Sequence, residues 1–161
     1  MTISATIDLD EAARTGWDAV VVGAGPAGSV AARELSSRGL RTLLVDRKSF
    51  PRNKVCGACV NGRAVAALVQ LGLDGILQRS HAVPLDRFRV QSCGRQVVVP
   101  LPGGVAVTRS ALDAGLLEAA HLGVPGPVGP DLRVGAVLAR DAVEPPLDAV
   151  DQLVGPQRGR V

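Results

Sequence analysis

Three glycines, at positions 23, 25 and 28, form the spacing G-x-G-x-x-G together with Pro26 and Ala27. In this spacing the first glycine permits a tight turn, the second lets the backbone approach a diphosphate, and the third lets a helix pack closely on a strand. Exposed N–H groups and the dipole at a helix start favour phosphate charge. The segment therefore predicts a dinucleotide-binding turn, with a purely structural glycine turn as the alternative.

An acidic residue, Asp46, ends the next apolar run. A carboxylate at this place can accept hydrogen bonds from ribose hydroxyls. Arg47 and Lys48 follow it and could instead receive a 2′-phosphate, as in NADP sites; the alternative is that they face solvent or lie beside the adenosine. These residues alone leave FAD and NAD(P) open as the nucleotide.

The pair Cys56 and Cys59 forms a C-x-x-C spacing. It could be a redox dithiol beside a flavin, or half of a zinc site, although no second Cys/His pair stands at a workable spacing. We favour a third interpretation, in which Cys56 belongs to a cofactor loop and Cys59 is incidental. No metal site is expected.

The segments that must position these residues are predicted to form a β-α-β unit. Residues 17–22 form a β-branched run without polar alternation, which is typical of a parallel strand buried on both faces. A helix is expected over 26–38, with Pro26 in its first turn and Gly39 just past its end. A second strand over 41–45 would close a right-handed crossover.

Further along, the pattern becomes a mixture of short elements. We expect a loop over 46–59, a helix over 61–71 capped by Asn61, and a helix over 109–121 capped by Thr108. Strands are expected at 86–91, 95–99 and 104–107, the first two joined through Ser92-Cys93-Gly94 as a hairpin. After a Gly/Pro tract at 123–130, only residues 132–138 could extend.

Composition excludes several classes of protein. The chain has 161 residues, enough for one domain with a real core, and its 47% hydrophobic content argues against disorder. Only three aromatic residues are present, so nucleic-acid binding through stacked bases is not expected. The net charge of +3 is spread along the chain, which favours a solvated surface.

Localisation is expected to be cytoplasmic. No secretory signal is recognisable at the start, where charged residues interrupt any apolar stretch. The charge-free run between Asp18 and Arg33 is too short to span a bilayer and contains three glycines and a proline. Three cysteines are an odd number, which does not suggest a secreted disulfide framework.

The chain resembles the FAD-dependent oxidoreductases, in the branch of geranylgeranyl reductases, flavin-dependent monooxygenases and halogenases. Three motifs carry the resemblance: the strand and glycine turn from Asp18 with Leu43 to Arg47, the block Phe50-Pro-Arg-Asn-Lys-Val-Cys-Gly57, and the helix start Arg109-Ser-Ala-Leu-Asp113. It implies an α/β fold: a Rossmann-like FAD/NAD(P)-binding domain, three-layered around a parallel sheet, incomplete, with the start of a β-rich substrate domain.

The resemblance also implies roles for individual residues. The glycine turn, with Pro26 and Ala27, would hold the diphosphate, and Asp46 with its neighbour Arg47 would lie at the adenosine ribose. Cys56 and Gly57 would lie beside the flavin ring, and Arg109 would reach the flavin side of the cofactor. No catalytic acid or base is assigned.

Domain boundaries follow from the extent of the resemblance. We expect a flexible leader over 1–16, a cofactor-binding region over 17–122 that includes the start of the substrate domain at about 82–107, and an irregular tail over 123–161. Members of the family are longer and carry a second FAD motif with a Gly-Asp dipeptide, which this sequence lacks. The chain is therefore expected to be an N-terminal portion, ending through truncation or a frame shift.

The resulting functional hypothesis is an FAD-binding oxidoreductase that acts on a lipophilic or aromatic small molecule, with NAD(P)H as a possible electron donor. Hydroxylation, halogenation and double-bond reduction all stay open, as does the oligomeric state. The alternatives are a non-catalytic remnant and an NAD(P)-binding module without flavin.

Overall fold

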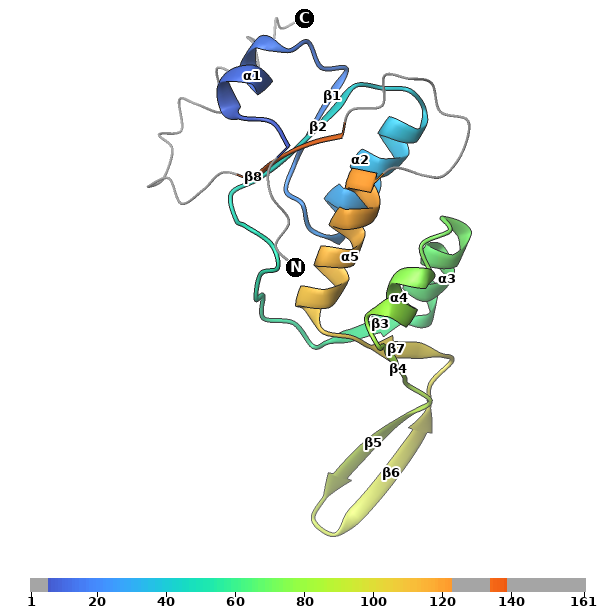
Figure 1. The fold of residues 1–161 in the computed structure, drawn as a ribbon. Helices are drawn as coiled ribbons and strands as arrows, with labels where there is room; N and C mark the ends of the chain where they lie inside the picture. Colours follow the sequence, from blue (N-terminus) through green and yellow to red (C-terminus); the bar gives the residue numbers. More distant parts are fainter. Residues whose placement is uncertain (1–5, 123–133, 139–161) are drawn as a thin grey trace, which may run out of the picture.

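A computed structural model describes residues 6–122 and 134–138 (Figure 1). No helix among these residues is long and apolar enough to cross a membrane. The order of elements is α1 (Leu9–Arg14), β1 (Ala19–Val22), α2 (Pro26–Ser37), β2 (Thr42–Asp46), β3 (Cys59–Asn61), α3 (Gly62–Gln70), α4 (Gly75–Arg79), β4 (Val83–Pro84), β5 (Arg87–Ser92), β6 (Arg95–Pro100), β7 (Gly104–Ala106), α5 (Arg109–Leu122) and β8 (Val134–Leu138).

The first sheet is parallel and has the order β1-β2-β8. On one face of β2, Leu44 packs in a cluster with Ala32 of α2 and Leu117 of α5. On the other face, Leu43 packs against Ala12 of α1. The helices α2 and α5 lie side by side (Figure 1). This is the expected α/β arrangement, with helices on both faces of β2.

Strand β1 differs from the expected strand that is buried on both faces. Val21 packs toward the cluster beneath α2, but Val20 and Val22 are 45% and 80% exposed. The helix on their side of the sheet, α1, contacts β8 and Leu43 of β2 instead. Because α1 does not extend over β1, the strand keeps one solvent-facing side in the described part of the chain.

In place of the flexible leader expected over 1–16, the structure shows helix α1. Asp8 caps it, since its side chain accepts a hydrogen bond from the backbone N–H of Glu11 at 2.7 Å. The indole of Trp17 donates to the carbonyl of Ala12 at 2.8 Å, and Ala12 is buried on Leu43. Capping and burial together outweigh the polar composition that suggested mobility. Residues 1–5 lie outside the described residues.

Within the tail expected to be irregular over 123–161, the one segment that could extend, 132–138, contains the regular strand β8. It pairs in parallel with β2 along its whole length, from Thr42 opposite Val134 to Asp46 opposite Leu138. The resemblance was expected to stop after α5, yet the chain returns to the first sheet as β8. The remaining tail residues lie outside the described part.

The region between β2 and α5 forms a second body of structure. The antiparallel sheet β3-β7-β4 lies beneath α3 and α4 (Figure 1). The expected caps are confirmed: the side chain of Asn61 accepts from the N–H of Ala64 at 2.9 Å, and that of Thr108 accepts from the N–H of Ala111 at 3.2 Å. The short elements β3, β4 and α4 were not predicted.

The hairpin β5–β6 projects away from the rest of the described chain (Figure 1). Its turn, Cys93-Gly94, has positive φ at both residues, as a type I′ turn requires. The pairing sets Phe88 opposite Val99 and Val90 opposite Val97, so these four side chains share one face. Every residue of both strands is exposed, so the hairpin adds nothing to the described core.

A hydrophobic cluster joins this second region to α5. Ile76 of α4 packs with Leu112 and Leu116 of α5, and all three are buried. Gly115 lets the two helices approach closely, because a Cβ placed there would lie 2.6 Å from the Cγ2 atom of Ile76. Helix α5 therefore packs on the first sheet with one side and on the region between β2 and α5 with another.

Candidate cofactor site

The turn from Gly23 to Gly28 joins β1 to α2. Gly23 has φ of +102°, a conformation that favours glycine, and its N–H donates to the carbonyl of Val45 at 2.7 Å. A Cβ on Gly28 would lie 1.8 Å from the carbonyl oxygen of Gly23. Gly25 is the N-cap of α2, and Pro26 stands in the first turn. The backbone N–H groups at the start of α2 therefore point into the space above Gly25.

The carboxylate of Asp46 is almost fully enclosed, with 4% of its side chain exposed. One oxygen, Oδ2, accepts from the N–H of Ala24 at 2.8 Å, and the other, Oδ1, accepts from the N–H of Lys48 at 2.9 Å. The Nη1 atom of Arg52 lies 3.2 Å from Oδ1 and 3.1 Å from Oδ2. Asp46 is therefore tied to the glycine turn through Ala24 and to the following loop through Lys48 and Arg52.

A second carboxylate, Asp113 of α5, joins the same network and is completely buried. It accepts a hydrogen bond from the Nε of Arg109, one helical turn earlier, and its Oδ2 lies 3.6 Å from the Nε of Arg52. Bonding to Asp113 raises the pKa of Arg109; contact with Cys56 acts in the same direction, and partial burial opposes both. Arg109 is consequently a fixed positive charge.

Both guanidinium groups reach the backbone at Gly25. A Cβ built on this glycine would lie 3.5 Å from an Nη2 of Arg109 and 3.6 Å from an Nη2 of Arg52. The space that a side chain would fill is therefore bounded by two arginines and by the start of α2. We call this arrangement, formed by Gly25, Arg52 and Arg109, the arginine cradle.

The arginine cradle fits a diphosphate. Guanidinium groups bind phosphate oxygens through paired N–H donors, and a helix N-terminus adds backbone N–H groups with a favourable dipole. Asp46, placed beside this cradle, has the acceptor chemistry that ribose hydroxyls require. The residues present therefore match the adenosine diphosphate part of FAD.

The cysteines lie on two different hollows. Cys56 is exposed and shares with Arg109 the lining of a shallow hollow of about 430 Å³. Cys59 is also exposed but belongs to β3 and lines another hollow. Neither forms a disulfide. Among the described residues, no three His, Cys, Asp or Glu side chains are grouped so that they could hold a metal ion.

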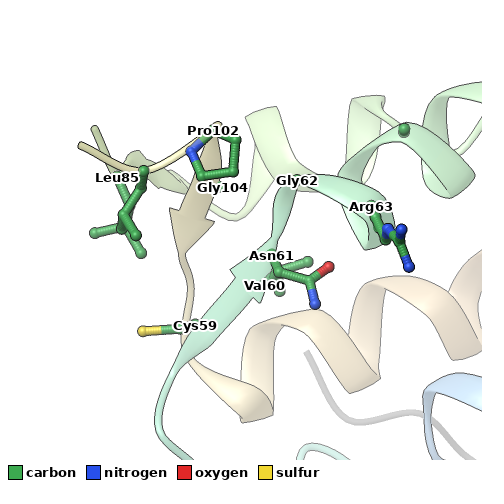
Figure 2. A pocket seen from close by; sticks show the side chains of 11 residues that line it. Cys59, Val60, Asn61, Gly62, Arg63, Leu85, Pro102 and Gly104 are labelled. Carbon is green, nitrogen blue, oxygen red and sulfur yellow. The ribbon is translucent and has the colours of Figure 1, made fainter. Parts of the chain in front are cut away.

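The hollow that Cys59 lines has a volume of about 670 Å³ and lies between residues 59–66 and part of the stretch 82–107 that is expected to start the substrate domain (Figure 2). Asn61 comes from β3 and Arg63 from the first turn of α3, while Leu85 and Pro102 close the opposite side (Figure 2). None of its lining residues belongs to the arginine cradle. It is a separate, largely apolar surface.

A basic hollow of about 520 Å³ follows β2. Four cationic residues and no carboxylate contribute to its lining, which consists of Arg47, Lys48, Ser49, Pro51, Arg52, Asn53 and Lys54. Arg47 and Lys48 are exposed there. Arg52 belongs both to this hollow and to the arginine cradle, so the two sites are adjacent.

The structure brings most of the predicted site residues together. The glycine turn and Asp46 meet directly, Arg109 reaches the turn from the first residue of α5, and Cys56 lines the same hollow as Arg109, while Gly57 is exposed. Arg47 instead faces the basic hollow. These placements leave each proposed cofactor contact a prediction.

Two residues of the network had been given no role from the sequence. Asp113 stands four residues after Arg109 in an expected helix, and that spacing favours an ion pair, so its partnership was recognisable. Arg52 offered no local signal. Its place depends on how the loop after β2 folds back over Gly25.

Together the parallel β-α-β unit, the glycine turn and the adjoining carboxylate define a nucleotide-binding protein of the Rossmann-like class. The family model described as "FAD binding domain" matches residues 17–112. The chain belongs to this FAD-binding domain family.

Several curated relatives are reductases by name. The chain is 41% identical over 105 residues to a menaquinone reductase of Mycolicibacterium smegmatis, covering 60% of this chain and 24% of the relative. It is 35% identical over 85 residues to digeranylgeranylglycerophospholipid reductase 3 of Methanosphaera stadtmanae, covering 52% and 18%. The chain thus spans about a quarter or less of the length of these relatives.

Solved structures support the fold. A flavin-dependent brominase superposes with a TM-score of 0.61 at 24% identity, covering 77% of this chain and 29% of that one. A flavoprotein/dehydrogenase from Cytophaga hutchinsonii gives a TM-score of 0.62 at 21% identity, covering 76% and 30%. At these identities the likeness concerns the fold alone.

Proposed function

We propose that this chain supplies the FAD-binding part of a flavin-dependent oxidoreductase. The observation that carries the proposal is the arginine cradle, in which Arg52 and Arg109 converge on Gly25 at 3.6 and 3.5 Å. A structural turn alone has no need of two guanidinium groups there, whereas a diphosphate binds well between them. The family match over residues 17–112 supports FAD as the nucleotide.

The cofactor, when bound, supplies the transfer of electrons to or from the substrate. The chain's own residues hold and orient it: the cradle neutralises diphosphate charge, and Asp46 accepts hydrogen bonds from the ribose. The bond to Asp113 holds the positively charged guanidinium of Arg109 in place, and Arg109 also contacts Cys56 on the side where the flavin is expected.

The substrate of this proposal is a lipophilic or aromatic small molecule. Support comes from the names of the relatives, which include a menaquinone reductase and a squalene epoxidase. NAD(P)H is the proposed electron donor. The proposed location is the cytoplasm, with which three exposed free thiols agree. Reduction and oxygenation are both compatible with the described residues.

A titration of the purified chain with FAD, followed by flavin fluorescence, tests the proposal. In Gly25→Ala the new methyl group makes only ordinary contacts with the two arginines, so the fold is retained, but it occupies the diphosphate position. We expect FAD affinity to fall at least about tenfold, which corresponds to roughly 1.4 kcal/mol. Unchanged affinity in this variant, or no FAD binding by the unmodified chain, would contradict the proposal.

Gly16→Ala is the matched control. Its added methyl group would likewise meet the end of an arginine, the Nη1 of Arg41 at 3.7 Å, but in a different part of the fold. We expect its FAD affinity and its melting temperature to equal those of the unmodified chain.

A second candidate function is an NAD(P)-binding module, which the basic hollow after β2 favours. Its cationic lining, with Arg47 and Lys48 exposed, suits a 2′-phosphate. Parallel titrations with FAD, NADH and NADPH separate the two functions. Preference for FAD supports the flavoprotein, and preference for NADPH that is lost in Arg47→Gln supports the module.

A further inference from the structure

We propose that Arg52 competes with the nucleotide ribose for Asp46 in the free chain and is released to the diphosphate when a nucleotide binds. Arg52 would thus be a cofactor-binding residue that exchanges one partner for another. The inference rests on the proposed function, because it concerns the same site.

The first argument is the occupancy of the Asp46 carboxylate. Its two oxygens accept from the backbone N–H groups of Ala24 and Lys48, at 2.8 and 2.9 Å. The Nη1 atom of Arg52 stands between the oxygens, at 3.1 and 3.2 Å, and with these three donors around it the carboxylate is only 4% exposed. A ribose hydroxyl can reach the carboxylate only by displacing one of these donors. Two of them belong to the backbone of the turn and loop, so Arg52 is the donor that can leave.

The second argument is the short path to a new partner. The same guanidinium that bonds Asp46 through Nη1 places its Nη2 atom 3.6 Å from the Cβ position of Gly25. A diphosphate entering the arginine cradle therefore meets Arg52 without any movement of the backbone. Arg52 only needs to turn its guanidinium from the carboxylate toward the phosphate.

The third argument is the balance of charge. The network contains two carboxylates, Asp46 and Asp113, and two guanidinium groups, Arg52 and Arg109, so it is formally neutral. A diphosphate brings negative charge into this neutral network, and an arginine drawn from a carboxylate can offset it at close range. Arg109 is bonded to the completely buried Asp113, whereas Arg52 is 3.6 Å from it and has a buried Nε without a hydrogen-bond partner. Arg52 is consequently the arginine that is freed.

Phe50 provides a surface on which this exchange can occur. The guanidinium carbon of Arg52 lies 4.7 Å from the centre of the Phe50 ring, which is buried. A cation over an aromatic face is attracted to the whole ring and tolerates displacement across it. The ring therefore supports the guanidinium in both positions, beside Asp46 and beside the diphosphate.

The test compares adenosine, which has a ribose and no phosphate, with ADP, which has both, by calorimetry. In Arg52→Met the apolar stem over Phe50 is kept and every donor is removed. We expect ADP to bind at least about tenfold more weakly, the loss of a charge-assisted hydrogen bond. We expect adenosine to bind more tightly than before, because its competitor for Asp46 is gone, and an unchanged adenosine affinity would overturn the competition. The ratio of the two affinities is the decisive readout.

Arg38→Gln is the matched control, because Arg38 is exposed at the far end of α2 and its removal changes the net charge equally. We expect an unchanged affinity ratio in this variant. Arg52→Lys is a second variant in case Arg52→Met does not fold; it keeps the positive charge but loses the forked pair of guanidinium N–H donors. We expect Arg52→Lys to retain more ADP binding than Arg52→Met. We expect it to bind adenosine no more weakly than the unmodified chain does.

The outcomes separate the inference from the proposed function. Equal weakening of adenosine and ADP would show that Arg52 has a structural role only, and would overturn the inference. An unchanged ADP affinity would also overturn it. If the unmodified chain binds neither FAD nor ADP, the proposed function fails as well. In the unmodified chain, the side-chain NMR signal of Arg52 is expected to shift on addition of ADP, and its failure to shift would again contradict the exchange.

Discussion

The Cα hydrogen of Gly28 points at the carbonyl of Gly23, and a Cβ in its place would lie 1.8 Å from that oxygen. The contact joins α2 to the end of β1, and both atoms belong to the backbone. Neither can move without displacing the turn on which Gly25 and the proposed diphosphate site are built.

The first prediction concerns Gly28→Ala. Because the clash is with backbone rather than with a flexible side chain, we expect the free energy of unfolding to fall by more than about 4 kcal/mol, or the protein to be insoluble. Urea unfolding followed by circular dichroism measures the change. Ala31→Ser, at an exposed position of the same helix, is the control. A urea midpoint for Gly28→Ala equal to that of the control would disprove the close contact.

The second prediction concerns the packing of α4 on α5. Gly115→Ala normally favours a helix by about 1 kcal/mol, but here the new methyl group would meet the Cγ2 of the buried Ile76 at 2.6 Å. We expect the cost of overpacking to exceed the gain in helix propensity, with a net destabilisation of about 1–2 kcal/mol. Ile76→Leu removes the branch at Cβ and should restore part of the loss in the double variant. A more stable Gly115→Ala protein would contradict this packing.

The third prediction concerns acid stability. Hydrogen bonds from the side chain and the backbone of Arg41 lower the pKa of Asp18. A carboxyl whose folded pKa lies below its unfolded value of about 3.9 stabilises the fold above that pH, and the contribution is lost as the pH falls through the folded pKa.

Asp18→Asn should therefore lower the urea midpoint near neutral pH and have a smaller effect below about pH 4, where both proteins converge. The measurement is a series of unfolding curves from acidic to neutral pH. Asp10→Asn, at another exposed carboxyl near the N-terminus, serves for comparison. A difference between Asp18→Asn and the unmodified chain that persists unchanged into acid would count against the Arg41 interaction.

The fourth prediction concerns the buried carboxylate of α5. Asp113→Asn leaves Arg109 and Arg52 without its negative charge, and breaking a buried ion pair costs about 3–5 kcal/mol. In the folded fraction, the two guanidinium groups should attract anions more strongly. We expect a lower melting temperature together with a larger stabilisation by ADP, measured by thermal unfolding at increasing ADP concentration. A melting temperature that ADP raises no more than in the unmodified chain would refute the electrostatic part of this prediction.

The local features of the fold were predictable from sequence. The glycine turn, the caps at Asn61 and Thr108, and the β5–β6 hairpin each depend on residues within a few positions of one another. Their side-chain and backbone preferences therefore act without help from distant parts of the chain.

The features that sequence did not reveal depend on distant contacts. Helix α1 is stabilised where Ala12 meets Leu43. An extended segment over 132–138 was expected, but its pairing with β2 across a gap of almost ninety residues was not. The exposure of Val20 and Val22 likewise follows from where α1 lies. In the site, Arg52 acquires its role only because its loop returns to both Asp46 and Gly25. Such positions follow from tertiary packing, which local pattern does not encode.

The segment between β2 and α5 has a topological consequence. It leaves the parallel sheet after Asp46 and leads into α5 at Arg109, and both of these residues adjoin the glycine turn. Within this segment the hairpin β5–β6 is fully exposed, so the hairpin can be lengthened or shortened without altering Arg52, Asp46 or Arg109 at the base. A change in that hairpin would leave the nucleotide-binding turn intact, and the proteins to which this chain is similar have names as different as menaquinone reductase, squalene epoxidase and flavin-dependent brominase.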